Sequence, residues 1–242
     1  EIELILKQTE TLDEFDPKLE KLKELLKERG KNLNNKALLF STYIHTLEYL
    51  YKNLTKIGFR VALIHGSIRE NDRFALRKRF ALPKDNQDAF DILLSSEVGC
   101  EGLDFQFCDF LINYDIPWNP MRIEQRIGRI DRYGQKSETV GILNFVTPGT
   151  IDADIYNRCL IRIGIFENSI GASEEILGSI AQEIKDIAES FQLNEEDKSL
   201  KLQQLSDNTI RDIQEQKLLE KRDAELFGLN LPSENWKSEI KQ

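Results

Sequence analysis

The stretch Gln125-Arg126-Ile127-Gly128-Arg129-Ile130-Asp131-Arg132 is the most informative part of the sequence, and Arg122 lies just upstream of it. On an α-helix, which turns about 100° per residue, its arginines and Gln125 would fall within an arc of roughly 120°, with the isoleucines on the opposite side. We therefore expect a helix that is anchored in a core on one side and presents guanidinium groups on the other. A guanidinium fork suits phosphate oxygens. Because a basic helix is more often simply solvated, the flanking segments decide between these interpretations.

Short apolar runs alternate with helical patterns on both sides of this stretch. The expected strands are Ala37–Ser41, Arg60–Ile64, Phe90–Leu94, Phe110–Tyr114 and Val140–Val146. The expected helices are 17–29, Thr42–Ile57, Glu70–Leu82, Ile151–Phe166, Glu174–Phe191 and roughly Asp207–Phe227, with Asn194–Lys201 as a linker. Continuous apolar strands between helices indicate a parallel sheet covered on both faces, which is an α/β fold.

Four loops that carry polar residues follow expected strands: 41–43, 65–69, 95–104 and 115–120. The carboxyl ends of parallel strands meet at one edge of a sheet, and ligands of such sheets bind there. We therefore expect these loops to form one active edge.

The composition is that of an ordinary globular protein, with 242 residues, 40% hydrophobic and 31% charged. This length suits one large domain or a domain with an appendage. The net charge is −9, and residues 166–242 carry 17 acidic against 9 basic side chains, so most of the acidity belongs to the C-terminal part. No apolar run approaches the roughly 18 residues of a membrane span, so we expect no membrane partner.

Several kinds of site are absent from the sequence. Three cysteines without a CxxC pair and two scattered histidines indicate reduced thiols, a cytoplasmic location and no metal ligands. No GxxxxGK[ST] phosphate loop occurs. Asp13-Glu14-Phe15-Asp16 is similar to a Mg²⁺-binding DExD box, but no buried strand precedes it and Pro17 indicates the start of a helix. Because the chain begins at Glu1 without Met or a signal peptide, we expect a piece of a longer protein.

Five motifs, taken in order, resemble those of the second motor lobe of superfamily 2 helicases. They are Ala37–Tyr43, His65-Gly66-Ser67, Leu93–Asp104, Asp115–Pro120 and Gln125–Gln135. The string from Tyr114 to Pro120, followed by Gln125 and ending in Arg132-Tyr133-Gly134-Gln135, is similar to the Swi/Snf-type double-stranded DNA translocases. Glu101–Phe107 ahead of Gln125–Gln135 resembles their bacterial RapA-like branch. The resemblance covers about residues 16–165.

This resemblance implies a RecA-like lobe over residues 1–168 and an acidic helical extension over 169–242. It implies a DNA-dependent ATPase and translocase in the full-length protein, with ATP and Mg²⁺ bound mainly by a first RecA-like lobe upstream. The chain alone is then expected to be inactive. The implied partners are that first lobe, double-stranded DNA and, through the helical tail, RNA polymerase or another protein.

The resemblance also implies roles for individual residues. Arg129 and Arg132 correspond to arginine fingers, and Gln125 to a sensor of the γ-phosphate. Gly102 and Asp104 correspond to positions near the nucleotide. The positions near the nucleic-acid backbone are Ser41, Thr42, Gly66, Ser67, Arg69, Ser95 and Ser96.

The sequence leaves alternatives open for other residues. Arg126 is either catalytic or bonded to the loop before the helix, and Asp104 is either a ligand residue or a cap. Cys100 is expected to be a packed small side chain, and Trp118 a packing anchor rather than a base-stacking residue. Ser41 and Thr42 could cap the helix that follows, and His65 is expected to pack in its turn. The basic residues of the helix over Glu70–Leu82, namely Arg73, Arg77, Lys78 and Arg79, either solvate it or contact DNA.

Two other functions remain compatible with the sequence. One is an RNA helicase lobe of the same superfamily, which the Asp115–Pro120 and Arg132–Gln135 motifs disfavour. The other is a non-catalytic interaction module derived from a motor lobe, which the intact arginines and Gln125 disfavour.

Overall fold

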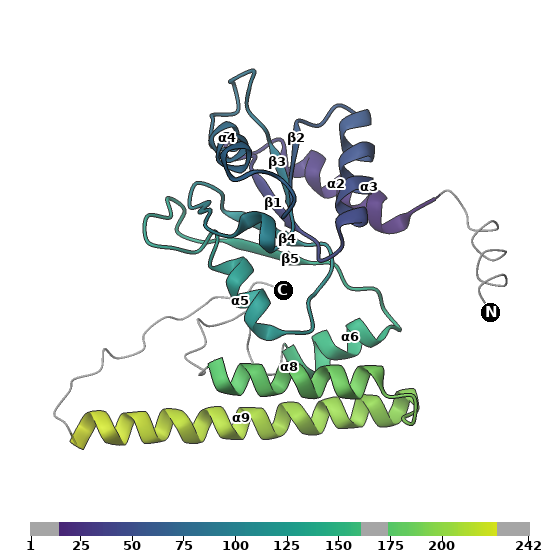
Figure 1. Cartoon of the computed structure of the whole chain (residues 1–242), viewed down its shortest axis with the longest axis vertical. Coiled ribbons are helices and arrows are strands. Elements are labelled where there is room, and N and C mark those ends of the chain that lie inside the picture. The colour runs from purple at the N-terminus through teal and green to yellow at the C-terminus, as the bar shows by residue number, and fades with distance from the viewer. Residues whose placement is uncertain (1–14, 161–173, 227–242) are drawn as a thin grey trace. The chain divides into compact units, whose positions relative to one another are not determined.

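The structure is a computed structural model and describes residues 15–160 and 174–226 (Figure 1). Contacts divide the chain into two compact units. Unit 1 holds the described residues up to Tyr114 together with Arg129–Phe145, and unit 2 holds Asp115–Gly128 together with the described residues from Val146 onward. The predicted boundary between residues 168 and 169 lies outside the described residues. The division into 1–168 and 169–242 therefore stays a prediction.

Unit 1 is built on a parallel sheet of five strands in the order β2-β3-β1-β4-β5. The strands are β1 (Ala37–Phe40), β2 (Val61–Ile64), β3 (Ile92–Ser95), β4 (Phe110–Asn113) and β5 (Gly141–Asn144). Ser95 pairs with both Ile64 and Phe40, and Asn113 pairs with both Phe40 and Asn144. The strands therefore end level with one another, and the loops that follow them emerge at one edge, which we call the carboxyl edge. The five predicted strands and the α/β class are confirmed.

Helices cover both faces of the sheet because successive residues of a strand point to opposite sides. On one face, α2 (Pro17–Arg29) and α3 (Ile44–Lys56) share a core with Leu39 and Leu94. On the other face, α4 (Glu70–Phe80) and the segment 100–108 share a core with Leu38 and Leu93. Figure 1 shows the sheet lying between these two layers.

The start of α2 lies where the sequence predicts it. Asp16 caps the helix, with its Oδ1 accepting a hydrogen bond from the Leu19 N–H at 3.0 Å, and Pro17 occupies the first turn. Asp16 is thus engaged in helix capping, in agreement with the rejection of a DExD box. Asp13 and Glu14 lie outside the described residues.

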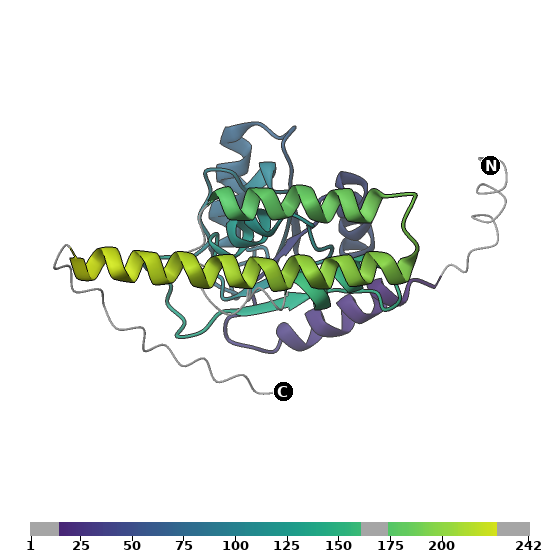
Figure 2. The same ribbon diagram turned by 90° about the horizontal axis from the view of Figure 1, so that it is seen from below.

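Unit 2 is helical over most of its described residues. It contains α5 (Pro120–Ile127), α6 (Ile151–Ile155), the π-helical turn η2 (Tyr156–Leu160), α8 (Glu174–Glu189) and α9 (Glu195–Leu226). Figure 1 and Figure 2 show α8 and α9 side by side and antiparallel. Their apolar residues, among them Ile184 and Leu202, share a core with Ile123 and Ile155. The helix predicted over Ile151–Phe166 is confirmed as far as Leu160, and its remaining residues lie outside the described part.

The linker predicted over Asn194–Lys201 is wrong, because α9 begins at Glu195. Asn194 caps this helix, since its Oδ1 accepts a hydrogen bond from the Asp197 N–H at 2.8 Å. Glu195, Glu196 and Asp197 follow in the first turn, where negative charge stabilises a helix. The helix that we expected to begin near Asp207 therefore begins well before it.

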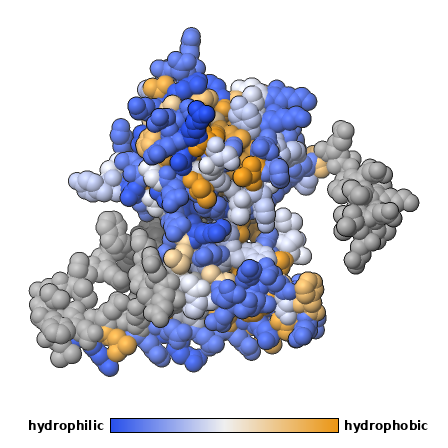
Figure 3. Space-filling model, in the orientation of Figure 1, coloured by the Kyte–Doolittle hydropathy of each residue, from blue (hydrophilic) through white to orange (hydrophobic). Residues whose placement is uncertain are grey.

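The face of the molecule drawn in Figure 3 is mostly hydrophilic, with smaller hydrophobic patches. Large exposed hydrophobic side chains occur in both units, for example Val98 in unit 1 and Leu219 in unit 2. The helices that the structure describes include none with the length and hydropathy needed to cross a membrane.

Candidate functional site

The arginine-rich stretch does not form one continuous helix. α5 ends at Ile127, Gly128 follows as its cap, and Arg129 and Arg132 lie in the turns beyond it. Two features explain this end. Glycine is a poor helix former, and the Arg129 carbonyl accepts a hydrogen bond from the Phe105 N–H at 2.9 Å instead of serving a helix. The predicted single face of guanidinium groups is therefore wrong.

Arg126 also departs from the prediction, because it is 1% exposed instead of facing solvent. Its Nη1 donates a hydrogen bond to the Asp115 carbonyl at 2.8 Å, and its Nη2 lies 3.5 Å from the Asp115 carboxylate. Arg126 thus holds the loop that precedes α5, and this contact supports its structural alternative. Arg122 and Gln125, on the same helix in unit 2, are exposed.

Arg129 and Arg132, which we call the arginine pair, are both tied to the segment Leu103-Asp104-Phe105, the 103–105 segment. The Arg129 Nη1 donates to the Leu103 carbonyl at 3.4 Å, and the Arg129 carbonyl accepts from the Phe105 N–H. Arg132 forms an ion pair with the Asp104 carboxylate. The structure therefore brings together three of the residues that the sequence placed near the nucleotide: both arginines and Asp104.

The ion pair of Arg132 lies open to solvent. The side chain of Arg132 is 49% exposed and that of Asp104 is 40% exposed. Such a surface pair holds its partners only weakly, by about 0–1 kcal/mol. The pair engages one nitrogen of the Arg132 guanidinium, which has five N–H donors, so the remaining donors suit a phosphate oxygen while Asp104 orients the group.

The two glycines of the loop after β3 are required for different structural reasons. A Cβ on Gly99 would lie 2.6 Å from the Ile64 carbonyl oxygen, so Gly99 allows the loop to pack against the end of β2. Gly102 has a φ of +75° and open space around it, a conformation that glycine adopts most readily. The exposed Gly102 suits the predicted position near a nucleotide, whereas the buried Gly99 contacts protein backbone.

The residues predicted near the nucleic-acid backbone fall into two groups. Ser41, Ser95 and Ser96 are buried, at 0%, 0% and 7% exposure. Their hydroxyls serve the loops: Ser41 Oγ accepts from the Tyr43 N–H at 3.2 Å, and Ser96 Oγ accepts from the Gly99 N–H at 3.1 Å. The exposed group consists of Thr42, Gly66, Ser67 and Arg69, which follow β1 and β2 at the carboxyl edge. Contact with nucleic acid stays a prediction for both groups.

The arginines of α4 make bonds that the sequence did not predict. Arg73 Nη1 donates to the Val98 carbonyl at 3.2 Å, and Arg77 Nε donates to the Asp104 carbonyl at 2.8 Å. Arg79 Nε donates to the Asp88 carbonyl at 2.9 Å. These side chains therefore hold loops of unit 1 instead of only solvating their helix. No spacing in the sequence signals such bonds, because backbone carbonyls leave no residue pattern.

Cys100 and Trp118 are both packed, as expected. Cys100 is fully buried, its Sγ lies 2.8 Å from Ser95 Oγ, and burial raises the pKa of its thiol to about 12. A thiol of this kind is inert as a nucleophile near neutral pH. In unit 2, Trp118 packs against the core, and its Nε1 donates to the Asp152 carboxylate at 2.7 Å.

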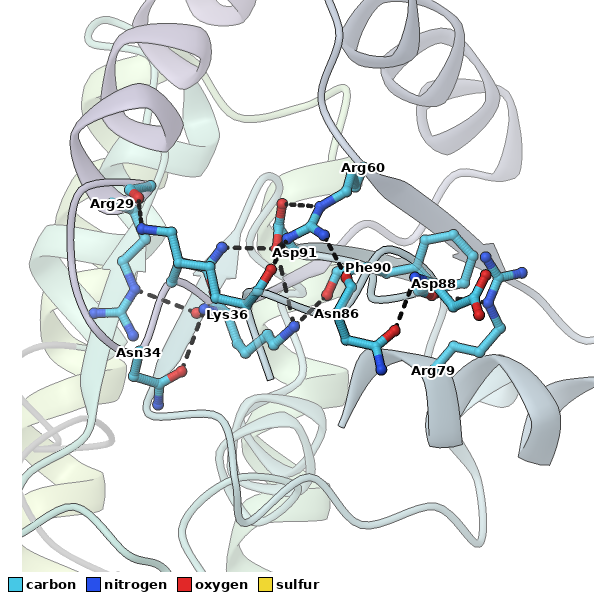
Figure 4. Close-up of polar contacts among 12 residues, drawn as sticks. Arg29, Asn34, Lys36, Arg60, Arg79, Asn86, Asp88, Phe90 and Asp91 are labelled. Atoms are coloured by element: carbon cyan, nitrogen blue, oxygen red, sulfur yellow. Dashed lines mark hydrogen bonds and ion pairs between the residues drawn. The ribbon is translucent and has the colours of Figure 1, made fainter. Parts of the chain in front are cut away.

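A second polar cluster lies at the opposite end of the strands, the amino edge, and the predicted site does not include it. Asp91 precedes β3 and accepts two hydrogen bonds from Arg60, which precedes β2, at 2.7 and 2.6 Å. Asn35 donates to Asp91 at 2.7 Å, and Lys36, which precedes β1, lies 3.9 Å away (Figure 4). Burial lowers the pKa of the Lys36 ammonium, and the Asp91 charge opposes that effect.

Comparisons with known proteins support a helicase lobe. Residues 17–134 match the family described as the helicase conserved C-terminal domain. The chain is 35% identical over 150 residues to YqhH of Bacillus subtilis, an uncharacterized ATP-dependent helicase, and this covers 62% of the chain and 26% of YqhH. It is 38% identical over 125 residues to the RNA polymerase-associated protein RapA of Photobacterium profundum, which covers 51% of the chain and 12% of RapA.

A solved structure agrees on the fold. The C-terminal part of the Fun30 ATPase domain superposes with a TM-score of 0.50 and 23% identity, over 70% of this chain and 53% of that one. The chain spans only a minor part of either curated relative. The match to the helicase C-terminal family and the two curated relatives, together with the fold, support a RecA-like C-terminal lobe of a Swi/Snf-type superfamily 2 helicase.

Proposed function

We propose that this chain is the second motor lobe of an ATP-dependent double-stranded DNA translocase, in which Arg129 and Arg132 act as arginine fingers. The observation that carries the proposal is the arginine pair itself. Both guanidiniums are attached to the same 103–105 segment, and that of Arg132 is half exposed beside a carboxylate that orients it. A first lobe in the same polypeptide would hold most of the nucleotide.

The chemistry of phosphoryl transfer fits these residues. ATP supplies the phosphoryl group, whose transfer develops negative charge that fixed cations stabilise. An arginine finger raises the rate by about 10³–10⁵, which is roughly 4–7 kcal/mol of transition-state stabilisation. An ordinary surface ion pair contributes only about 0–1 kcal/mol. Arg129 and Arg132 would supply this charge, and exposed Gln125 would bond the γ-phosphate. Gly102 and Asp104 would lie beside the nucleotide.

In the described ranges, no group of three or more His, Cys, Asp and Glu side chains could hold a metal ion. Mg²⁺ at a nucleotide needs only one or two protein ligands beside the phosphates, and we assign those ligands to the first lobe, as the resemblance implies.

The DNA track is proposed at the carboxyl edge. Thr42, Gly66, Ser67 and Arg69 are exposed there, and hydroxyls, backbone amides and guanidinium groups suit contacts with phosphates that do not depend on base sequence. The buried Ser41, Ser95 and Ser96 would shape the loops that make these contacts. The relative RapA is RNA polymerase-associated by name, so RNA polymerase is a candidate partner for the helical part of unit 2.

The test uses the polypeptide that contains both lobes. Arg129→Ala and Arg132→Ala should each lower ATP hydrolysis stimulated by duplex DNA by about 10³-fold at saturating ATP. Arg122→Ala is the matched control, because it removes an exposed arginine of α5 just upstream of the motif and should leave turnover within about twofold. Equal turnover for all three variants would overturn the proposal. Greater stimulation by RNA than by duplex DNA would instead identify an RNA helicase.

A further inference from the structure

The 103–105 segment is held from two sides. The arginine pair contacts it through the Leu103 carbonyl, the Asp104 carboxylate and the Phe105 N–H. From α4, Arg77 Nε donates to the Asp104 carbonyl at 2.8 Å. The same residue, Asp104, is therefore bonded through its backbone to Arg77 and through its side chain to Arg132.

Aromatic packing fixes Arg77 in this position. Its guanidinium lies over the ring of Phe107, 5.4 Å from the centroid. Phe107 packs edge-on against Phe80, one turn after Arg77 in α4, with centroids 5.4 Å apart, and against Phe105 at 6.2 Å. From the same helix, Arg77 thus bonds the Asp104 backbone while Phe80 packs on the rings of Phe105 and Phe107. A guanidinium held both by a hydrogen bond and by a ring has little freedom to move.

We infer that Arg77 is a positioning residue for the arginine pair, and this inference rests on the function proposed above. Arg77 fixes the peptide that orients Asp104, and Asp104 with its neighbours orients Arg129 and Arg132. A displacement of about 1 Å in a catalytic group can cost on the order of 100-fold in rate. Loss of the Arg77 bond should therefore lower turnover even though Arg77 does not touch the nucleotide.

The same helix offers a matched control. Arg79 Nε donates to the Asp88 carbonyl at 2.9 Å, and its guanidinium lies over the ring of Phe90 at 4.2 Å. Arg79 therefore makes the same two kinds of contact as Arg77, with a loop that carries no predicted site residue. Arg77→Gln and Arg79→Gln remove the same kinds of interaction, and because Arg79 is the more exposed of the two, Arg79→Gln should lower thermal stability no more than Arg77→Gln does. Only Arg77→Gln should affect the arginine pair.

The experiment measures DNA-stimulated ATP hydrolysis in the polypeptide with both lobes. We expect Arg77→Gln to lower kcat by about 10- to 100-fold with little change in the KM for ATP, because the arginine pair acts in the transition state. Arg79→Gln should stay within about twofold. Arg77→Lys keeps the charge and can donate one hydrogen bond to Asp104, so its kcat should lie between those of Arg77→Gln and the unmodified protein.

A double-substitution cycle separates positioning from general stability. Single-turnover rates with enzyme in excess keep slow variants measurable. If Arg77 acts through the arginine pair, Arg77→Gln should have little further effect in an Arg132→Ala background. The same fold loss in both backgrounds, or equal losses for Arg77→Gln and Arg79→Gln, would overturn the inference. A full rate for Arg129→Ala and Arg132→Ala in the same series would overturn the arginine-finger proposal instead.

Discussion

The two edges of the sheet in unit 1 use charged residues in opposite ways. At the amino edge, the residue just before each of four neighbouring strands is charged, and the signs alternate across the sheet. In the order β2, β3, β1 and β4, these residues are Arg60, Asp91, Lys36 and Asp109. Most of them are bonded to neighbours within the edge. At the carboxyl edge, Arg132 has one carboxylate partner and remains half exposed.

The bonding of the arginines makes this difference concrete. Arg60 gives two hydrogen bonds to Asp91 and one each to the Asn86 and Lys84 carbonyls, both at 2.8 Å. The N–H donors of the Arg60 guanidinium are therefore bonded to protein groups. Among the described residues, the Arg132 side chain pairs only with Asp104, so its other donors can bind a ligand. The comparison teaches that an arginine is assigned to structure or to function by how completely its donors are bonded, and not by its presence in a basic motif.

The largest effect at the amino edge should follow from Asp91→Ala. This change leaves the partly buried Arg60 and the nearly buried Lys36 without their carboxylate, and loss of these charged hydrogen bonds should cost about 2–3 kcal/mol in the free energy of unfolding. Denaturant unfolding of the two-lobe protein measures the loss. Turnover per folded molecule should remain unchanged. A stable but inactive Asp91→Ala protein would contradict the assignment of the amino edge to structure and the carboxyl edge to function.

A second effect tests how the carboxyl edge is assembled. A methyl group on Gly99 would meet the Ile64 carbonyl at 2.6 Å, so Gly99→Ala must displace the loop from β2 and should cost about 2 kcal/mol of stability. Gly102→Ala meets no atom but must adopt a positive φ, which costs about 1 kcal/mol. Thermal unfolding compares the two variants. Equal losses would show that the contact with β2 does not constrain the loop.

The sequence predicts the sheet better than it predicts these contacts. Continuous apolar runs indicate all five strands, and the loops of the carboxyl edge follow from a parallel sheet. The prediction of one helix through all the arginines is wrong because α5 ends at Gly128, and helical spacing does not apply beyond it. The cap at Asn194 has a local signal in the acidic residues after it, although such a polar run is also typical of a linker. The bond from Arg77 to Asp104 had no local signal, because it depends on how α4 packs against a distant loop.

The third effect applies the same substitution to the other edge. Asp104→Ala removes the exposed partner of Arg132, and a surface pair of this kind contributes at most about 1 kcal/mol to stability. We expect unchanged denaturant unfolding but a loss of turnover of up to about tenfold, because Arg132 loses the group that orients it. Parallel measurement of Asp91→Ala gives the contrast. If Asp104→Ala destabilised the protein as strongly as Asp91→Ala, the carboxyl edge would be structural as well.

The smallest effect concerns two cysteines that lie beneath the two edges. Cys100 lies in the loop after β3 at the carboxyl edge, Cys108 precedes Asp109 at the amino edge, and burial raises the pKa of both thiols to about 12. Since alkylation requires a thiolate, neither should be labelled in the folded protein near about pH 8, and both should react once it is unfolded. Mass spectrometry of digested peptides distinguishes the two positions.

The same raised pKa values set the direction of a pH effect. In the unfolded chain these thiols have a pKa near 9.0, so between about pH 9 and 12 the unfolded state loses protons that the folded state retains. Stability should therefore be unaffected by these groups below about pH 9 and should fall as the pH rises through that window. Cys100→Ala should reduce the fall, as measured by denaturant midpoints. Rapid labelling of Cys100 but not Cys108 in the folded state would show that the carboxyl edge opens to its core, which would make the two edges differ in packing as well as in charge.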